Sequence, residues 1–403
     1  MEESHPPFPE DPQAPKHTHF PEDPLAPKPP APGPPKDEDA KAKEKPEKKK
    51  SMLREWTEAL VFAFIAVLLF RIFFFETFAI PSGSMDRTLL SGDYIVVNKL
   101  AYGPRLPITP LTIPFAHQKI AGGNKAYLDW IQLPYWRIPG YADIAHNDVL
   151  VFNFPSDDIF PLEGPPEKYP IDHRTHFVKR CMGLPGDTFL ISAADVYVNG
   201  KKLPVPPGAL FEYGIKTDSV IRDTLLLRKL GMAQESRQKD HWLYTVSLTH
   251  DEADSIRKRK DVRGVELVSA QPGAHEPDLF PNSDRFPWNL DHYGPLVIPR
   301  AGDSVRLSID SLPLYKRIIV NYEENLLGVR NDTIFINGKP AKYYTFKMNY
   351  YFMLGDNRHD SFDSRVWGLV PEDHIVGRAA FILFSYDKQV EKTRWDRVFD
   401  VIR

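Results

Sequence analysis

One continuous apolar segment near the start of the chain limits its possible folds more than any other feature. From Ala59 to Phe70 twelve residues run without a polar side chain, and four more apolar residues follow Arg71. As a helix, residues 59–75 span about 26 Å, and a few flanking residues extend this to the ~30 Å of a hydrocarbon core. A core helix would carry a polar stripe, and a cleaved signal peptide would start closer to the N-terminus. The segment therefore predicts a transmembrane helix over residues 55–78.

The residues before this segment have a composition that cannot form a core. Fourteen of the 39 prolines fall in the first 50 residues, which contain no Ile, Val, Trp, Tyr or Cys. Such a segment buries too little apolar surface to offset the entropy of ordering it, so residues 1–50 predict a disordered, Pro/Lys-rich cytoplasmic tail. Lys48, Lys49, Lys50 and Arg54 lie just before the apolar run. By the positive-inside rule the N-terminus is cytoplasmic and the rest of the chain lies outside.

The remainder of the chain is rich in short β-branched and aromatic runs bounded by Gly, Pro, Asn and Asp. This pattern is typical of strands joined by turns and predicts a mainly β, antiparallel core. Asn-Gly pairs at 199–200 and 337–338 favour tight hairpins in the two halves of this core. The strands are expected at residues 92–100, 147–154, 175–184, 195–201, 303–309, 332–339, 350–356 and 374–386.

Two segments interrupt the predicted core. One is rich in Pro and aromatic residues, and the other lacks a strong strand pattern, so both are expected to form lids or cap surfaces. The expected organisation is a first core part at 79–201 with an insertion at 103–170, an inserted cap region at 202–300, and a second core part at 301–387.

A helical period appears in two places. Apolar residues recur at helical spacing within 225–260, and a stripe from Trp395 to Ile402 recurs at i, i+3, i+4 and i+7. The stripe predicts an amphipathic tail over residues 388–403, which either packs on the core or lies in a membrane interface.

The composition excludes several kinds of function. A lone cysteine, Cys181, excludes an internal disulfide, a zinc cage of several thiolates and a CxxC redox pair. The net charge of −3 leaves no basic excess for binding nucleic acid. The polar cluster at 355–368 is rich in Asp and Asn, but Arg358 and Arg365 place positive charge among its potential calcium ligands. We therefore expect no metal, no cofactor and no nucleic-acid partner.

Two serines directly follow the apolar segment. Ser82 and Ser84 flank a single glycine, a tripeptide that by itself is more typical of a turn. A nucleophilic serine needs a base, and none of the 13 histidines is a compelling candidate. Lys179 lies two residues from both Phe177 and Cys181, and burial on their strand face would lower its pKa towards neutrality, as a lysine base requires. A solvated strand edge is the alternative for this lysine.

Four motifs, taken together and in order after the apolar segment, resemble those of bacterial type I signal peptidases. They are Ser82-Gly-Ser-Met85, Gly92-Asp-Tyr-Ile-Val-Val-Asn-Lys99, Lys179-Arg180 with Gly183-Leu-Pro-Gly-Asp187, and Gly355-Asp-Asn-Arg358 with Ser361-Phe-Asp-Ser-Arg365. The sequence departs from the family pattern after Met85, where Asp86 and Arg87 replace a step that often contains proline. It also has one apolar segment where some members have two.

The resemblance implies a Ser/Lys dyad, with Ser84 as nucleophile and Lys179 as general base. It further implies that the Ser82 hydroxyl and the Ser84 backbone N–H form an oxyanion hole, and that Ser361 orients the lysine amine. Asp363 and Arg365 match the pair of charges that supports this site.

The substrates implied by the resemblance are exported preproteins with small residues at the first and third positions before the cut, as in Ala-x-Ala. Such residues need shallow apolar pockets, for which Met85, Ile95 and Val96 are candidate wall residues. The implied location is the outer, periplasmic face of the bacterial cytoplasmic membrane, with the lipid bilayer as a second partner.

Two other functions stay open at this point. An anchored β protein that binds envelope partners would use Lys179 and the 355–368 cluster only as ion pairs. A self-cleaving repressor would share the Ser/Lys chemistry, but the apolar segment and the lack of a DNA-binding pattern count against it.

Overall fold

The computed structural model describes residues 51–156, 169–221, 234–237 and 241–403. The predicted tail at 1–50 therefore lies outside the described residues. The chain divides into two units, Met1–Thr57 and Glu58–Arg403. Within the first unit, only the short segment that begins the apolar helix is described.

The apolar segment forms helix α1, Met52–Phe73, which spans about 33 Å at 1.5 Å per residue. None of its residues is buried, and within the described ranges it is the one helix long and apolar enough to cross a membrane. The predicted end at residue 78 is wrong. Phe75–Ala79 instead form strand β1, because their backbone groups pair with the antiparallel strand β2, Asp93–Asn98.

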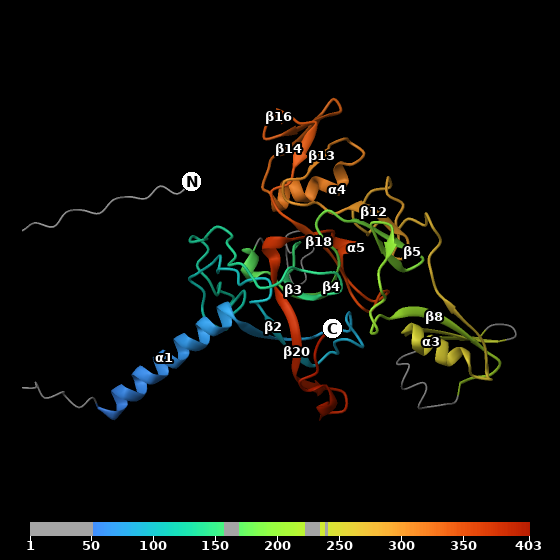
Figure 1. The fold of residues 1–403 in the computed structure, drawn as a ribbon, viewed down its shortest axis with the longest axis horizontal. Helices are drawn as coiled ribbons and strands as arrows, with labels where there is room; N and C mark the ends of the chain where they lie inside the picture. Colours follow the sequence, from blue (N-terminus) through green and yellow to red (C-terminus); the bar gives the residue numbers. More distant parts are fainter. Residues whose placement is uncertain (1–50, 157–168, 222–233, 238–240) are drawn as a thin grey trace, which may run out of the picture. The chain divides into compact units, whose positions relative to one another are not determined.

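The main sheet is antiparallel throughout and brings distant parts of the sequence together (Figure 1). The strands follow the order β1, β2, β20 (Ile375–Asp387), β3 (Val149–Asn153), β4 (His176–Gly183), β18 (Tyr350–Leu354) and β19 (Val370–Pro371), with β21 (Lys392–Thr393) also paired to β20. Register shifts interrupt three of these pairings, β2 with β20, β20 with β3 and β4 with β18, and such bulges bend and curl a sheet.

Both faces of this sheet are covered, as strand β3 demonstrates. All five of its residues are buried. Val149 and Val151 belong to one apolar cluster, whereas Leu150 and Phe152 belong to another. Because side chains alternate along a strand, a polar side chain in the neighbouring strand β4 is forced into one of these two apolar layers.

Besides the main sheet, the described residues form three small sheets, a fourth that is described below, and several short helical segments. The predicted Asn-Gly hairpins are confirmed, since Asn199, Gly200, Asn337 and Gly338 all have the positive φ angles that such turns require. The strands are β5 (Thr188–Ser192), β6 (Asp195–Val198), β7 (Lys201–Lys202), β12 (Tyr293–Val297), β13 (Ser304–Arg306), β14 (Leu327–Arg330), β15 (Thr333–Ile336), β16 (Lys339–Pro340) and β17 (Tyr343–Thr345). The helical segments are η1 (Ile171–His173), α4 (Leu312–Arg317), η2 (Ile318–Tyr322), α5 (Ser364–Trp367) and η3 (Glu372–His374).

The region expected to lack strands contains a sheet with its own apolar cluster. Its strands are β8 (Phe211–Thr217), β9 (Gln234–Arg237), β10 (Trp242–Leu248) and β11 (Val262–Leu267), and helix α3 (His250–Arg257) packs beside them. The helical period predicted over 225–260 is confirmed at α3 but wrong for β10, whose side chains alternate between buried and half-buried. Residues 222–233 and 238–240 lie outside the described ranges. We call β8 to β11 with α3 the inserted sheet.

The predicted helical tail is also wrong. Only Trp395–Arg397 (η4) turns, and Phe399 adopts a positive φ of 64° that ends any helix. The chain then runs alongside β20, where the Ile402 N–H donates to the Ala380 carbonyl at 3.0 Å. Ile402 is buried, whereas Trp395 and Phe399 are exposed. Backbone pairing with β20 therefore overrides the helical spacing of the apolar side chains.

Candidate active site

Ser84 lies on a loop closed at its base by the sheet. The Ile80 N–H donates to the Asp93 carbonyl at 2.8 Å, and the Gly92 N–H donates to the Ile80 carbonyl at 2.9 Å. Met85 and Leu89 are both fully buried and fix the loop against the apolar cluster below it. This anchoring leaves Ser84 only half-buried, at the edge of a cavity.

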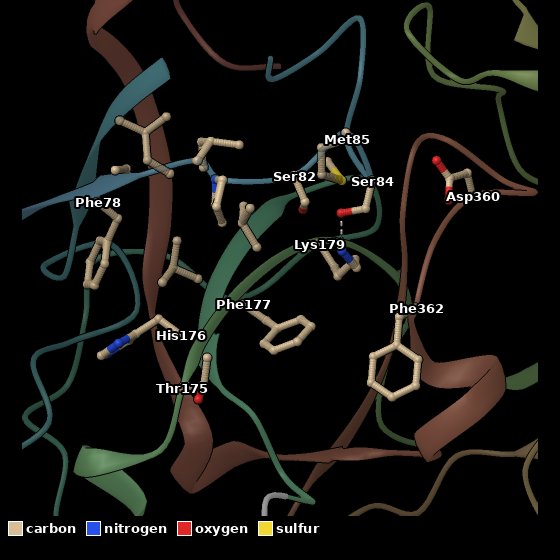
Figure 2. A pocket seen from close by; sticks show the side chains of 17 residues that line it. Phe78, Ser82, Ser84, Met85, Thr175, His176, Phe177, Lys179, Asp360 and Phe362 are labelled. Carbon is tan, nitrogen blue, oxygen red and sulfur yellow. Dashed lines mark hydrogen bonds between the residues drawn. The ribbon is translucent and has the colours of Figure 1, made fainter. Parts of the chain in front are cut away.

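Lys179 comes from strand β4 and is 3% exposed. Its Nζ lies 2.5 Å from the Ser84 hydroxyl oxygen and 5.6 Å from the centre of the Phe177 ring (Figure 2). Phe177 and Cys181, the neighbours two residues away, belong to one apolar cluster. The predicted burial of this lysine is therefore confirmed, and the solvated edge is excluded.

Burial determines the protonation of this lysine. Removal from water disfavours its ammonium form and lowers the pKa of Lys179 to about 8, against the opposing effect of the Asp363 and Asp356 carboxylates. Arg365 adds a smaller lowering effect. A substantial fraction of the amine is thus neutral near physiological pH and able to accept a proton.

Two buried ion pairs surround the Ser84–Lys179 contact. Arg365 donates to both carboxylate oxygens of Asp363, at 2.9 and 2.8 Å. Burial alone would raise the pKa of Asp363, but the Arg365 charge and backbone N–H donors hold it below its usual value. The Gly355 N–H also donates to Asp363, at 3.1 Å, so the pair fixes the segment that passes behind Ser84.

The second pair joins the strand of Lys179 to the loop of Ser84. Arg180 donates to both oxygens of Asp356, at 2.7 and 2.6 Å, and both residues are almost completely buried. Asp356 also accepts a hydrogen bond from the Thr88 hydroxyl at 2.6 Å. The next residue, Asn357, donates its N–H to the Ser84 carbonyl at 3.1 Å. Bidentate, buried pairs of this kind fix geometry as well as charge.

Gly355 is required where these segments meet. A Cβ atom at this position would lie 2.6 Å from the Ser84 carbonyl and 2.1 Å from the Ser361 hydroxyl. Both distances are far below van der Waals contact, so only glycine allows the 355–361 segment to approach Ser84 this closely.

The cavity beside Ser84 has a volume of about 470 Å³. Figure 2 shows Ser82 and Ser84 on one side of it and the Phe177 and Phe362 rings below. Its walls are mainly apolar and come from β1, the Ser84 loop, β2, β3, β4 and the 360–362 segment. They consist of Phe78, Ala79, Ile80, Pro81, Ser82, Gly83, Ser84, Met85, Ile95, Val151, Thr175, His176, Phe177, Val178, Lys179, Asp360 and Phe362.

Not all the predicted site residues take their expected places. Met85 and Ile95 line the cavity, but Val96 does not, because successive side chains in β2 point to opposite faces of the sheet. Ser361 lies beside the site, yet its buried hydroxyl has no hydrogen-bond partner among the described residues. Its expected hydrogen bond to Lys179 is therefore not formed in this structure.

Several residues of the site escaped prediction. Phe78 lines the cavity although nothing in its local sequence marks it as a site residue. Phe177 and Phe362 line it too, and each stands within two residues of a predicted site residue. Arg180 and Asp356 belong to the motifs of the sequence, but only the structure shows that they form an ion pair across the sheet. Their pairing spans 176 positions of sequence, so a single sequence gives no direct signal for it.

The other titratable candidates do not share this geometry. His359 pairs with Asp291, and His374 pairs with Asp373; neither histidine lines the cavity. Cys181 is fully buried, which raises the pKa of its thiol and keeps it protonated. Within the described ranges no group of three or more His, Cys, Asp or Glu side chains is placed to hold a metal ion.

A buried lysine in contact with an accessible serine, on an antiparallel β sheet, defines the site of a serine hydrolase. Comparison with known proteins narrows this class. Residues 53–247 and 297–384 match the family described as "Signal peptidase, peptidase S26". The chain belongs to this family of serine peptidases, which act on exported preproteins and are associated with membranes.

Individual relatives extend the similarity over most of the chain. The signal peptidase I of Pseudomonas fluorescens is 30% identical over 349 residues, which cover 84% of this chain and 75% of that protein. That of Haemophilus influenzae is 26% identical over 372 residues, covering 91% and 80%. That of Buchnera aphidicola subsp. Acyrthosiphon pisum is 26% identical over 325 residues, covering 81% and 73%.

Proposed function

We propose that this protein removes signal peptides from exported preproteins with Ser84 as nucleophile and Lys179 as general base. The observation that carries the proposal is the 2.5 Å contact between the Lys179 amine and the Ser84 hydroxyl. Neutral Lys179 takes the hydroxyl proton while the Ser84 oxygen attacks the scissile carbonyl. The protonated lysine then gives that proton to the leaving amine and, neutral again, activates the water that releases the acyl group.

An oxyanion hole stabilises the negative charge that develops on the carbonyl oxygen. The Ser82 hydroxyl and the Ser84 backbone N–H are the proposed donors, each contributing about 3 kcal/mol to the stability of the transition state. In support, the Ser82 and Ser84 side chains lie along the same cavity wall (Figure 2). Ser361 is proposed to orient the lysine amine once substrate is bound, since its hydroxyl is buried without a partner.

This cavity is the proposed binding site for small residues before the cut. We assign the side chains of an Ala-x-Ala sequence to its apolar walls, with Met85 and Ile95 close to the nucleophile and Phe78 further along. Asp363 and Arg365 hold the segment opposite the nucleophile in place and contact no substrate.

The membrane brings enzyme and substrate together. Helix α1 is proposed to cross the bilayer with its N-terminus in the cytoplasm, which places the catalytic sheet on the outer, periplasmic face. A shared membrane surface raises the local concentration of the precursor without any further contact. Exposed Trp395 and Phe399 beside the sheet offer additional apolar surface to lipid.

The remaining regions take subordinate roles in this proposal. The inserted sheet is a cap beside the active site, connected to the Ser84 loop by the Arg87–Glu252 ion pair at 2.9 Å. Residues 1–50 form a cytoplasmic tail. No metal or cofactor takes part in the proposed reaction.

A synthetic precursor peptide tests the proposal directly. The full chain in detergent should cleave a peptide with Ala-x-Ala before the cut and leave a matched Leu-x-Leu peptide intact. Ser84→Ala should abolish this cleavage, with Ser91→Ala, a change at an exposed serine of the same loop, as its control. Normal turnover by Ser84→Ala would refute the assignment of the nucleophile.

A further inference from the structure

A second cavity adjoins the active-site cavity. Its volume is about 320 Å³, and its walls come mainly from the end of helix α1 and from a hairpin-like arm, residues 104–138. Backbone hydrogen bonds hold the two halves of the arm together, such as that from the Leu106 N–H to the Trp136 carbonyl at 3.0 Å. The base of the arm is fixed to the main sheet, where Arg105 donates to the Asn153 side chain at 2.8 Å. The second cavity is therefore a built part of the fold.

His176 of strand β4 stands between the two cavities and lines both of them. The centre of its ring lies 4.7 Å from that of Phe78, in the wall of the active-site cavity, and 5.0 Å from that of His117, in the wall of the second cavity. Figure 2 shows Phe78 and His176 together at the end of the active-site cavity away from Ser84. On β1, Glu76 lines the second cavity two residues before Phe78 lines the first. The second cavity therefore continues the path that starts at Ser84.

The spacing along β4 determines which part of a bound precursor reaches the second cavity. Lys179 contacts Ser84, and His176 lies three residues earlier on the strand, a distance of about 10 Å at ~3.3 Å per residue. An extended precursor that runs from Ser84 towards Phe78 covers this distance in about three residues. Its fourth residue before the cut then lies beside His176, and the fifth and sixth lie at the second cavity.

The walls of the second cavity are mainly apolar. Leu68 and Ile72 contribute from α1, and Leu106, Ile113 and Phe115 contribute from the arm. Burial lowers the pKa of the shared histidine at position 176 to about 3, so its ring is neutral at physiological pH. Apolar side chains of a bound precursor would displace water from these walls, which is favourable.

The charged groups of this cavity already have partners within the fold. Glu76 pairs with both Arg71, at 2.6 Å, and Lys99, at 2.8 Å. Asp172 accepts hydrogen bonds from the N–H and the hydroxyl of Thr109, at 2.8 and 2.9 Å. A charged precursor side chain would have to compete with these contacts and also lose its hydration. The cavity thus favours uncharged, apolar side chains.

We infer that the second cavity binds apolar precursor side chains at about the fifth and sixth positions before the cut. The inference rests on the proposed function, because it takes Ser84 as the nucleophile and a signal peptide as the substrate. The enzyme then recognises two features of a precursor, small side chains beside Ser84 and larger apolar ones beyond His176. Contacts this far from the reacting atoms are equally strong in the bound state and the transition state, so they lower KM without changing kcat.

Peptides of two lengths test the inference with the full chain in detergent. All carry Ala-x-Ala before the cut; the long peptide has leucine at the sixth and fifth positions, and the short peptide starts at the fourth. The KM of the long peptide should be several-fold lower, and replacing both leucines by lysine or by glutamate should remove this advantage. Equal KM values for the leucine and the charged peptides would overturn the inference. Failure to cleave any of the peptides would instead refute the proposed function.

A variant of the arm separates binding in the cavity from partition of the peptide into detergent. Ala116 lines the second cavity, so Ala116→Trp fills part of it. Ala121→Trp, at an exposed position of the same arm outside the cavity, is the matched control. Ala116→Trp should raise the KM of the long peptide to that of the short one and leave the short peptide unaffected, whereas Ala121→Trp should change neither. The same effect from both variants would contradict the inference.

Photo-cross-linking locates the bound residues without any change in the arm. The full-length Ser84→Ala variant, which should bind without cleaving, is mixed with long peptides that carry a benzophenone group at the sixth or the second position before the cut. The sixth-position probe should label residues 105–117 or 68–72, which line the second cavity, and the second-position probe should not. Labelling of the inserted sheet by the sixth-position probe, or the same labelled residues with both probes, would overturn the inference.

Discussion

The main sheet and the inserted sheet use charged residues in opposite ways. At the main sheet and the segments packed beside it, both members of the pairs Arg180–Asp356 and Asp363–Arg365 are at most 2% exposed, and each pair is bidentate. In the inserted sheet, the pairs Lys216–Glu266 and Arg263–Asp218 have side chains that are 38–68% exposed. Exposed pairs contribute about 0 to 1 kcal/mol, whereas breaking a buried pair costs about 3 to 5 kcal/mol.

Lys179 and Lys216 show the same difference between a buried and an exposed charged side chain. Each belongs to a strand, but Lys179 is buried in an apolar layer and Lys216 extends into solvent beside Glu266. Burial lowers the pKa of Lys179 to about 8. Strand position alone therefore does not make a lysine a base; the apolar environment does.

The largest expected effect is the loss of cleavage when the Lys179 amine is removed. Removing the Lys216 amine is the control. Lys179→Met should lower the rate of precursor-peptide cleavage by about a thousand-fold or more, because general-base catalysis contributes factors of this order. Lys216→Met should leave the rate within twofold. Steady-state cleavage assays measure both, and circular dichroism checks that each variant is folded. Similar cleavage rates for the two variants would show that the buried lysine of the main sheet and the exposed lysine of the inserted sheet do not differ in function.

The arginine of the buried pair should show the next largest effect, this time on stability. Arg180→Ala leaves Asp356 charged and unpaired in the interior, which should cost about 3 to 5 kcal/mol in the free energy of unfolding. Arg263→Ala removes an exposed partner of Asp218 and should cost less than about 1 kcal/mol. Urea unfolding of the full chain in detergent compares them. Equal costs would show that burial does not determine the contribution of these pairs.

A third, smaller effect is the dependence of cleavage on pH. The base must be neutral, and the pKa of Lys179 is about 8. Well above pH 8 the lysine is neutral and kcat/KM should be constant. At pH 8 about half of it is protonated, and well below pH 8 each unit of pH should lower kcat/KM about tenfold. Lys216→Met should reproduce this profile. A profile that stays flat between pH 6 and pH 9 would exclude Lys179 as the base.

The sequence predicted the main sheet better than the inserted one, for a physical reason. Strands such as β3 and β20 are rich in β-branched and aromatic residues and are bounded by turn residues, so local composition identifies them. In the inserted region, β8 and β10 alternate buried and half-buried residues over only seven positions each. The helical period over 225–260 obscured this alternation in β10, whereas β8 lies before that window. The helical prediction from the C-terminal apolar stripe is wrong because these residues pair with the distant strand β20. That long-range pairing outweighs the local spacing of the apolar side chains.

The site was partly predictable as well. Ser84 and Lys179 were identified from motifs and from the apolar neighbours of the lysine, and their contact followed the expectation. Val96 was misplaced because it is adjacent to Ile95 in β2, and successive side chains of a strand point to opposite faces. The role of Arg180 could not be predicted, since its partner Asp356 comes from a strand end far along the chain. Local sequence thus indicates which residues carry chemistry, whereas pairing across the sheet determines what positions them.

The smallest effect that we predict lies at the first turn of helix α3 in the inserted sheet. Thr249 and Glu252 form a capping box there, in which each side chain accepts a hydrogen bond from the other residue's backbone N–H. Thr249→Ala should cost about 1 kcal/mol. Ser255→Ala, at an exposed position of the same helix, should cost less than about 0.5 kcal/mol. Hydrogen exchange of the α3 amides measures both changes.

Neither change in α3 should alter peptide cleavage by more than twofold if the inserted sheet is an independent cap. Among the described residues, the ion pair that joins α3 to the Ser84 loop is Arg87–Glu252, and it is partly exposed, so loosening the helix end transmits little energy to Ser84. A clear loss of cleavage in Thr249→Ala, with Ser255→Ala unaffected, would contradict this independence. It would mean that the inserted sheet positions the catalytic loop through Glu252, and the two sheets would then have to be treated as one catalytic unit.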